Sequence, residues 1–75
     1  ISKPITTLGR ENSDVILPNH KVSRKHAKIV FNGSCFEIID DGSTNGVWVN
    51  GQKVSQTTLR SGDTIILGDV IITFI

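Results

Sequence analysis

The stretch AKIVFNGSCFEIID, residues 27–40, decides the fold. Side chains of a strand alternate between its two faces, so Ala27, Ile29 and Phe31 would point to one side. The Asn-Gly pair that follows is the strongest short-range signal for a tight turn between antiparallel strands. Phe36 and Ile38 would continue the apolar face on the returning strand. The stretch therefore predicts a β-hairpin that places one face in a core.

Short apolar runs rich in β-branched residues lie on both sides of this hairpin. They cover residues 5–8, 15–17, 47–49, 64–67 and 70–75, with turn-forming residues between them. Asn50-Gly51 predicts a second hairpin over residues 47–54. The last two runs are more continuously apolar, which is typical of strands covered on both faces or paired against another sheet. No stretch keeps the 3.6-residue period of a helix, so we expect an all-β sandwich or barrel.

Composition limits the classes of function. The chain has 75 residues, enough for one domain, and its net charge of +1 is too small for a broad basic face that binds nucleic acid. The single Cys35 cannot form an internal disulfide, and with two histidines it offers no metal-ligand spacing. No apolar run could span a bilayer and no signal peptide is seen. We expect no metal, cofactor, nucleic acid or membrane partner, and the start at Ile1 predicts a fragment of a longer protein.

Polar side chains with no evident structural role gather in three loops, at residues 9–12, 19–26 and 41–46. Loops at one end of a β-sandwich come together from distant sequence positions. These loops would supply four cations and several hydroxyl and amide groups: Arg10, Lys21, Arg24, Lys25, Ser23, Ser43, Thr44 and Asn45. A phosphate prefers an arginine fork with hydroxyl and backbone donors. The inventory therefore predicts a local site for one anion.

Catalysis is the alternative that Ser23 and His26 raise. A serine nucleophile needs a base that a third group orients. If residues 22–31 enter a strand, Ser23 and His26 point to opposite faces. The chain also lacks the Gly-x-Ser-x-Gly turn. We therefore expect a binding domain and not an enzyme.

Three ordered motifs carry a resemblance to a known family. They are Gly9-Arg10, Ser23-x-x-His26 and Ser43-Thr44-Asn45-Gly46. The similarity extends to residues 14–18, 49–51 and 59–68, so it covers nearly the whole chain as one domain, residues 1–75. The sequence resembles a forkhead-associated (FHA) domain. The resemblance implies a β-sandwich of two twisted, mainly antiparallel sheets that binds phosphothreonine peptides through loops at one end.

The resemblance also implies roles for single residues. Phosphate would be bound by Arg10, Ser23, Arg24 and Thr44, and the peptide backbone beside phosphothreonine by Asn45. Lys21 would set specificity at the third residue after phosphothreonine, where its charge motivates an acidic preference. Structural support would come from Gly9, His26 and Gly46, with His26 holding the second loop against the sandwich. The chain departs from the family in Val47, where threonine is common, and the family's further edge strands would be clipped at one or both ends.

The expected function is phosphothreonine-dependent docking of partner proteins in a Ser/Thr kinase pathway. The domain would act as a monomer in the cytoplasm or nucleus, which suits a chain with one cysteine. A second hypothesis keeps the fold but uses a sheet face as a plain protein–protein scaffold, which an exposed Trp48 would favour. A third, a barrel that binds single-stranded nucleic acid, needs aromatic residues interleaved on a basic face. The phenylalanines lie in apolar runs instead.

Overall fold

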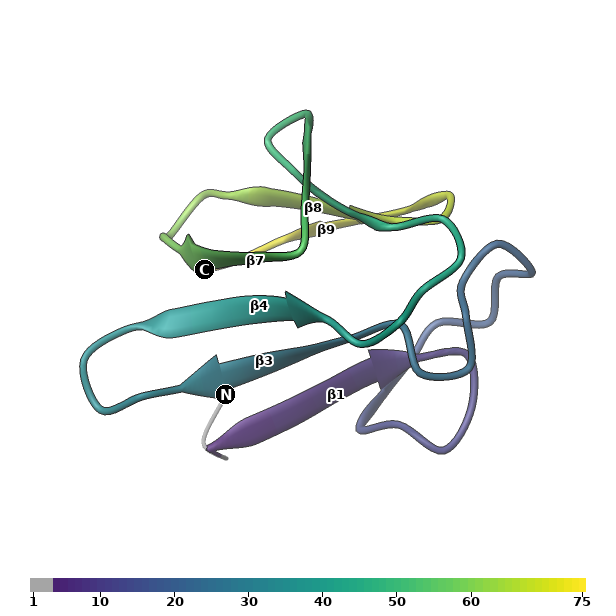
Figure 1. Cartoon of the computed structure of the whole chain (residues 1–75), viewed down its shortest axis with the longest axis horizontal. Coiled ribbons are helices and arrows are strands. Elements are labelled where there is room, and N and C mark those ends of the chain that lie inside the picture. The colour runs from purple at the N-terminus through teal and green to yellow at the C-terminus, as the bar shows by residue number, and fades with distance from the viewer. Residues whose placement is uncertain (1–3) are drawn as a thin grey trace.

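The computed structural model describes residues 4–75, which form two β-sheets packed face to face (Figure 1). Nine strands are present in this part of the chain: β1 (Ile5–Gly9), β2 (Val15–Ile16), β3 (Ala27–Phe31), β4 (Phe36–Asp40), β5 (Val47–Val49), β6 (Gln52–Val54), β7 (Gln56–Leu59), β8 (Thr64–Leu67) and β9 (Val70–Thr73). The first sheet has the order β2-β1-β3-β4-β7 and the second the order β6-β5-β8-β9. All pairings are antiparallel except the parallel pairing of β1 with β2. The predicted β-sandwich with mainly antiparallel sheets is confirmed.

Both predicted hairpins are present. In the first, β3 pairs with β4 so that Ile29 lies opposite Ile38. In the second, β5 pairs with β6, and the two turn residues have φ angles of 51° at Asn50 and 84° at Gly51. Positive φ at both central residues is the geometry that Asn-Gly turns favour between antiparallel strands. The first hairpin has a longer connection, residues 32–35, because Phe31 pairs with Phe36, and of its Asn-Gly pair only Gly33 has a positive φ, 96°.

The core lies between the sheets, as the alternation predicts, with one exception. Its fully or nearly buried apolar side chains come from both sheets and from one loop: Leu8, Val22, Ala27, Ile29, Ile38, Val47, Val49, Leu59, Ile65 and Leu67. The expectation that Phe31 shares the buried face is wrong, because its side chain is 41% exposed. Phe31 is the last residue of β3, at the margin of the sandwich, where its ring packs on Phe36 with 4.7 Å between ring centroids.

Two further differences concern strands near the C-terminus. β7 was not expected, since Gln56, Thr57 and Thr58 supply no apolar run, and it forms by pairing with β4 at the edge of the first sheet. β8 and β9 pack against the other sheet on one face only, so the alternative of cover on both faces is wrong. The side chain of Ile71, on the outer face of β9, is 68% exposed.

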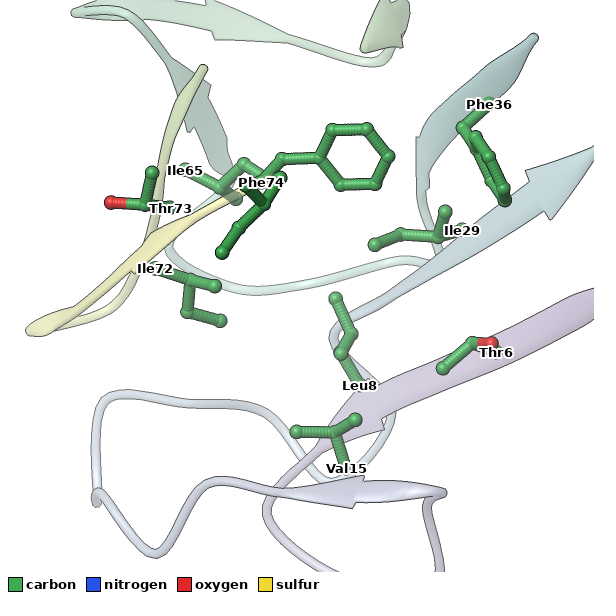
Figure 2. Close-up of a pocket in the computed structure, with 10 residues that line it drawn as sticks. Thr6, Leu8, Val15, Ile29, Phe36, Ile65, Ile72, Thr73 and Phe74 are labelled. Carbon is green, nitrogen blue, oxygen red and sulfur yellow. The ribbon is translucent and has the colours of Figure 1, made fainter. Parts of the chain in front are cut away.

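An apolar cleft of about 310 Å³ opens between the sheets beside β9 (Figure 2). Leu8 and Ile29 point into it from the first sheet, Ile72 from the second sheet and Phe74 from the segment after β9. β9 pairs with β8 on one side and with no strand of residues 4–75 on the other. Among the described residues, the second sheet therefore ends in an unpaired backbone edge next to apolar surface.

His26 connects the loops that gather at one end of the sandwich. Its side chain is completely buried. Nε2 donates to the carbonyl oxygen of Gly46 at 2.7 Å, and Nδ1 accepts from the backbone N–H of Ser23 at 3.1 Å. Its own backbone N–H donates to Leu8, and its carbonyl accepts from Asp41. One residue thus joins β1 and two loops that are more than fifteen positions apart in the sequence.

Asp63 provides a similar connection at the end that carries the β5–β6 turn. Its carboxylate accepts from the backbone N–H of Arg60 at 2.8 Å and from the side-chain amide of Asn50 at 3.0 Å. These hydrogen bonds, the one from Arg60 first, lower the pKa of Asp63 below its ordinary value of 3.8.

Replacing His26 by alanine should destabilise the domain by about 2–4 kcal/mol, because it opens a cavity and leaves Ser23 N–H and Gly46 C=O without partners. Chemical denaturation measures the loss. His20→Ala, an exposed histidine of the same loop, is the matched control and should stay within about 0.5 kcal/mol of the parent. Equal denaturation midpoints for the two variants would contradict the role assigned to His26.

Acid should weaken the domain partly through Asp63. A pKa that is lower in the folded state means that the ionised carboxylate stabilises the fold above the unfolded value near 3.8, and that this contribution is lost as pH falls through the folded value. Asp63→Asn should therefore flatten the loss of stability between about pH 5 and pH 2. Asp41→Asn, which removes one exposed charge of the same sign, controls for net charge. If Asp63→Asn lost stability with falling pH as steeply as the parent does, the stabilising role of the Asp63 carboxylate would be refuted.

Candidate functional site

A polar groove lies where the three loops meet at one end of the sandwich. Its volume is about 460 Å³. Residues from all three predicted loops line it: Arg10, His20, Lys21, Val22, Ser23, Arg24, Lys25, Gly42, Thr44 and Asn45. The structure therefore brings together all six of the candidate phosphate, peptide and specificity residues that the sequence singles out. The three support residues, Gly9, His26 and Gly46, lie in or beside the same loops.

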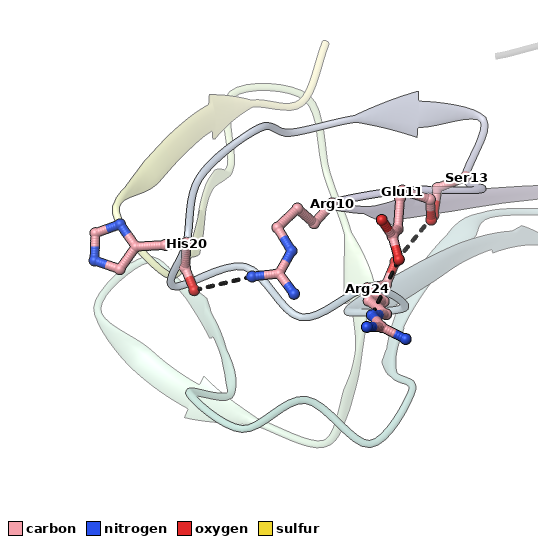
Figure 3. Close-up of polar contacts among 5 residues, drawn as sticks. All are labelled: Arg10, Glu11, Ser13, His20 and Arg24. Carbon is pink, nitrogen blue, oxygen red and sulfur yellow. Dashed lines mark hydrogen bonds and ion pairs between the residues drawn. The ribbon is translucent and has the colours of Figure 1, made fainter.

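Arg10 directly follows β1 and lines this groove, with its side chain extending toward His20 of the second loop (Figure 3). Its backbone N–H donates to the carbonyl of Ser23 at 3.0 Å, which fixes the start of its side chain. The guanidinium makes one weak hydrogen bond, from Nη1 to the carbonyl of His20 at 3.5 Å. Within residues 4–75 Arg10 has no carboxylate partner. Most of its five N–H donors are thus available to an anion.

Ser23 and Thr44 face each other across two loops. The hydroxyl oxygen of Ser23 accepts from the backbone N–H of Thr44 at 3.1 Å, which leaves the hydroxyl hydrogen to donate elsewhere. The backbone of Ser23 is held by His26 at the same time. A hydroxyl donor is therefore positioned in the groove that also contains the Arg10 guanidinium.

Asn45 ties the third loop to the second. Its side-chain amide donates to the carbonyl of Lys21 at 2.7 Å, and its own carbonyl accepts from the indole N–H of Trp48 at 3.3 Å. Gly46 follows with a φ of 82°, and its N–H donates to the hydroxyl of Ser43 at 3.0 Å. The side chain of Asn45 remains exposed at the rim of the groove. The hydrogen bond from the Trp48 indole to the Asn45 carbonyl joins β5 to the third loop.

Two of the other three candidate cations are already paired with carboxylates. Arg24 Nε lies 3.0 Å from Oε1 of Glu11 (Figure 3), and Lys21 Nζ lies 3.5 Å from Oδ1 of Asp69. Sequence reasoning missed both acidic partners. Glu11 directly follows the Gly-Arg motif, which is a signal that could have identified it, whereas Asp69 reaches the groove only through the packing of the two sheets.

Two glycines allow these segments to approach. A Cβ at Gly9 would collide with the carbonyl oxygen of Arg24, so only glycine lets β1 pass this close to the second loop. A Cβ at Gly68 would lie 2.8 Å from the carbonyl carbon and oxygen of Lys21, and Gly68 has a φ of 63°. The groove residues Arg24 and Lys21 are thus each in close backbone contact with a glycine, Gly9 and Gly68 respectively.

The geometry gives no support to Ser–His catalysis. His26 donates from Nε2 to a carbonyl and accepts at Nδ1 from a backbone N–H, so neither ring nitrogen is available to deprotonate Ser23. The conditional argument that a strand over residues 22–31 would separate Ser23 from His26 does not apply, because β3 begins at Ala27. In the described part of the chain no three His, Cys, Asp or Glu side chains come together as metal ligands. No helix among residues 4–75 is long and apolar enough to cross a membrane.

Comparison with known proteins places the chain in a family. Residues 6–68 match the FHA domain. The chain is 38% identical over 76 residues to an oxoglutarate dehydrogenase inhibitor of Corynebacterium efficiens and 36% identical over 76 residues to the glycogen accumulation regulator GarA of Mycolicibacterium smegmatis. Both alignments include 100% of this chain, which spans about half the length of these relatives, 54% and 48%. The names of both relatives describe regulatory proteins.

Solved structures agree. One from a structural and functional analysis of phosphothreonine-dependent FHA domain interactions superposes with a TM-score of 0.92 at 34% identity, covering 97% of this chain and 77% of its own. The match over residues 6–68 includes the three motifs and most of both sheets. The chain belongs to the FHA domain family.

Proposed function

We propose that this domain binds segments of partner proteins that contain phosphothreonine. The observation that carries the proposal is Arg10, a half-buried residue that lines the groove, without a carboxylate partner in residues 4–75 and with the Ser23 hydroxyl in the same groove. Its relatives' names and the solved FHA domain that interacts in a phosphothreonine-dependent manner support the same assignment.

Phosphate binding would use the donors that the loops hold in place. Arg10 would donate two N–H groups to two phosphate oxygens, and Ser23 would donate its hydroxyl to a third. Each hydrogen bond to a charged group contributes about 1.5–3 kcal/mol. An unmodified threonine would leave these donors with water, so the difference between phosphorylated and unmodified peptide arises from this pocket.

The remaining candidate residues would act at its edges. Thr44 would support the phosphate from the third loop, and Asn45 would hold the peptide backbone beside phosphothreonine. Arg24 would reach the phosphate after leaving Glu11, from which it is separated by 3.0 Å in an exposed ion pair. Such exposed pairs stabilise by at most about 1 kcal/mol, so a phosphate dianion can displace the carboxylate. Lys21, with Asp69, would form the subsite farther along the peptide.

The domain would therefore be a regulatory docking module without catalytic activity. Residues 1–75 would form one such module, monomeric and intracellular, that brings its parent chain to proteins marked by Ser/Thr kinases. Its support residues are Gly9, His26 and Gly46, which hold the loops together but would not touch the phosphate. No metal or cofactor has a part in this mechanism.

Arg10→Ala should weaken binding of a phosphothreonine peptide about 10- to 100-fold, because it removes the main charge-assisted donors. Calorimetric titration of a degenerate phosphothreonine peptide pool measures the effect, beside matched phosphoserine and unmodified threonine pools. Lys28→Ala, which removes a cation from β3 outside the groove, is the control and should bind as the parent does. Arg10→Lys should recover part of the affinity, since it restores the charge but not the planar fork.

Equal binding of phosphorylated and unmodified pools by the folded parent domain would contradict the proposal. So would full affinity in Arg10→Ala. Either result would turn attention to the sheet faces as a site for protein contacts.

A further inference from the structure

We propose that Glu11 and Asp69 are specificity-determining residues, which make the groove select phosphothreonine segments without acidic neighbours. This inference rests on the proposed function of the same groove. It names the chemistry of the preferred ligand: one phosphate, flanked by neutral or basic residues.

The first step is the distribution of charge. Four cations line the groove, namely Arg10, Lys21, Arg24 and Lys25. Glu11 pairs with Arg24 and Asp69 with Lys21, whereas Arg10 and Lys25 have no carboxylate partner within residues 4–75. The groove therefore keeps an excess of about two positive charges, which matches one phosphate with its charge of about −1.5 to −2 at pH 7. With the phosphate bound, the groove would keep little net positive charge to attract a further carboxylate on the ligand.

The second step is that the fold holds both acidic residues in place. On one side, the hydroxyl of Ser13 lies 3.1 Å from the carbonyl of Glu11 and 3.4 Å from that of Arg24, and Gly9 packs directly on the carbonyl of Arg24. On the other side, Gly68 packs on the backbone of Lys21 and places the next residue, Asp69, beside it. These contacts hold the backbones of Glu11 and Asp69 beside the groove residues Arg24 and Lys21, so each carboxylate stays within reach of its partner cation.

The third step follows from what phosphate binding does to these pairs. Arg24 is 75% exposed and Glu11 52% exposed, so their ion pair is weak and can exchange. When Arg24 turns to the phosphate, Glu11 is left without its partner at the end of the groove. An ionised carboxylate there repels an acidic side chain on the ligand. Asp69 would act in the same way beside Lys21, which reverses the acidic preference that the charge of Lys21 alone suggests.

The test compares two singly phosphorylated peptides that differ only in the residues around phosphothreonine, alanine in one and aspartate in the other. Binding is measured by calorimetry for the parent, Glu11→Gln, Asp69→Asn and the double variant. Glu37→Gln, which removes one negative charge from β4 outside the groove, is the matched control. Circular dichroism verifies that each variant is folded.

The parent should prefer the alanine peptide. Each substitution should strengthen binding of the aspartate peptide about two- to fivefold relative to the alanine peptide, and Glu37→Gln should leave the ratio unchanged. At about 1 M salt, where the screening length falls to about 3 Å, the preference of the parent should disappear.

A parent that binds both peptides equally, or prefers aspartate, would overturn the inference while leaving phosphothreonine binding intact. A double variant with the parent's ratio would also overturn it, because the selection would then come from other groups. Failure of the parent to bind either phosphorylated peptide would instead remove the proposed function, and this inference with it.

Discussion

The hydrogen bonds of one buried imidazole hold the functional end of this domain together. His26 accepts from Ser23 in a partly buried hydrogen bond and donates to Gly46 in a buried one. A buried hydrogen bond is expensive to leave unmade, so the two loops cannot separate without loss of stability. The relative positions of Ser23 and Asn45, and hence the width of the groove, depend on this residue. The role of His26 is structural, because both of its ring nitrogens already form hydrogen bonds within the protein.

The sequence predicts the parts of the structure that depend on neighbouring residues. The alternation around Asn32-Gly33 and the turn at Asn50-Gly51 fix two hairpins, and both are present. The three polar loops could be assigned to one site because loops at the end of a sandwich converge. Strand β7 could not be predicted, since its polar residues become a strand only by pairing with β4. The exposure of Phe31 depends on where β3 ends relative to the other sheet, and a local sequence pattern does not predict that position.

In the candidate site, too, the sequence predicts which charged residues are present but not how they pair. A list of cations can be made from the sequence, but which of them are neutralised depends on contacts across the fold. The ion pair of Lys21 with Asp69 joins residues 48 positions apart, and it exists because the turn after β8 packs on the second loop. The structure also assigns Gly9 and Gly68 a role that turn preferences do not predict. They are positions of close approach, and a methyl group at either would push a side of the groove outward.

The edge position of β9 within residues 4–75 bears on how easily the strands beside the groove open locally. Arg10 follows β1 and Asn45 precedes β5, and each of these strands has a neighbour on both sides. Asp69 directly precedes β9, which has a neighbour on one side only within residues 4–75. Edge strands open locally at lower free-energy cost than central ones, and their outward amides exchange hydrogen with solvent faster. Within residues 4–75, the turn that carries Asp69 therefore adjoins the strand expected to open most readily, and the amides of β9 that face away from β8 should exchange faster than those of β1 and β5.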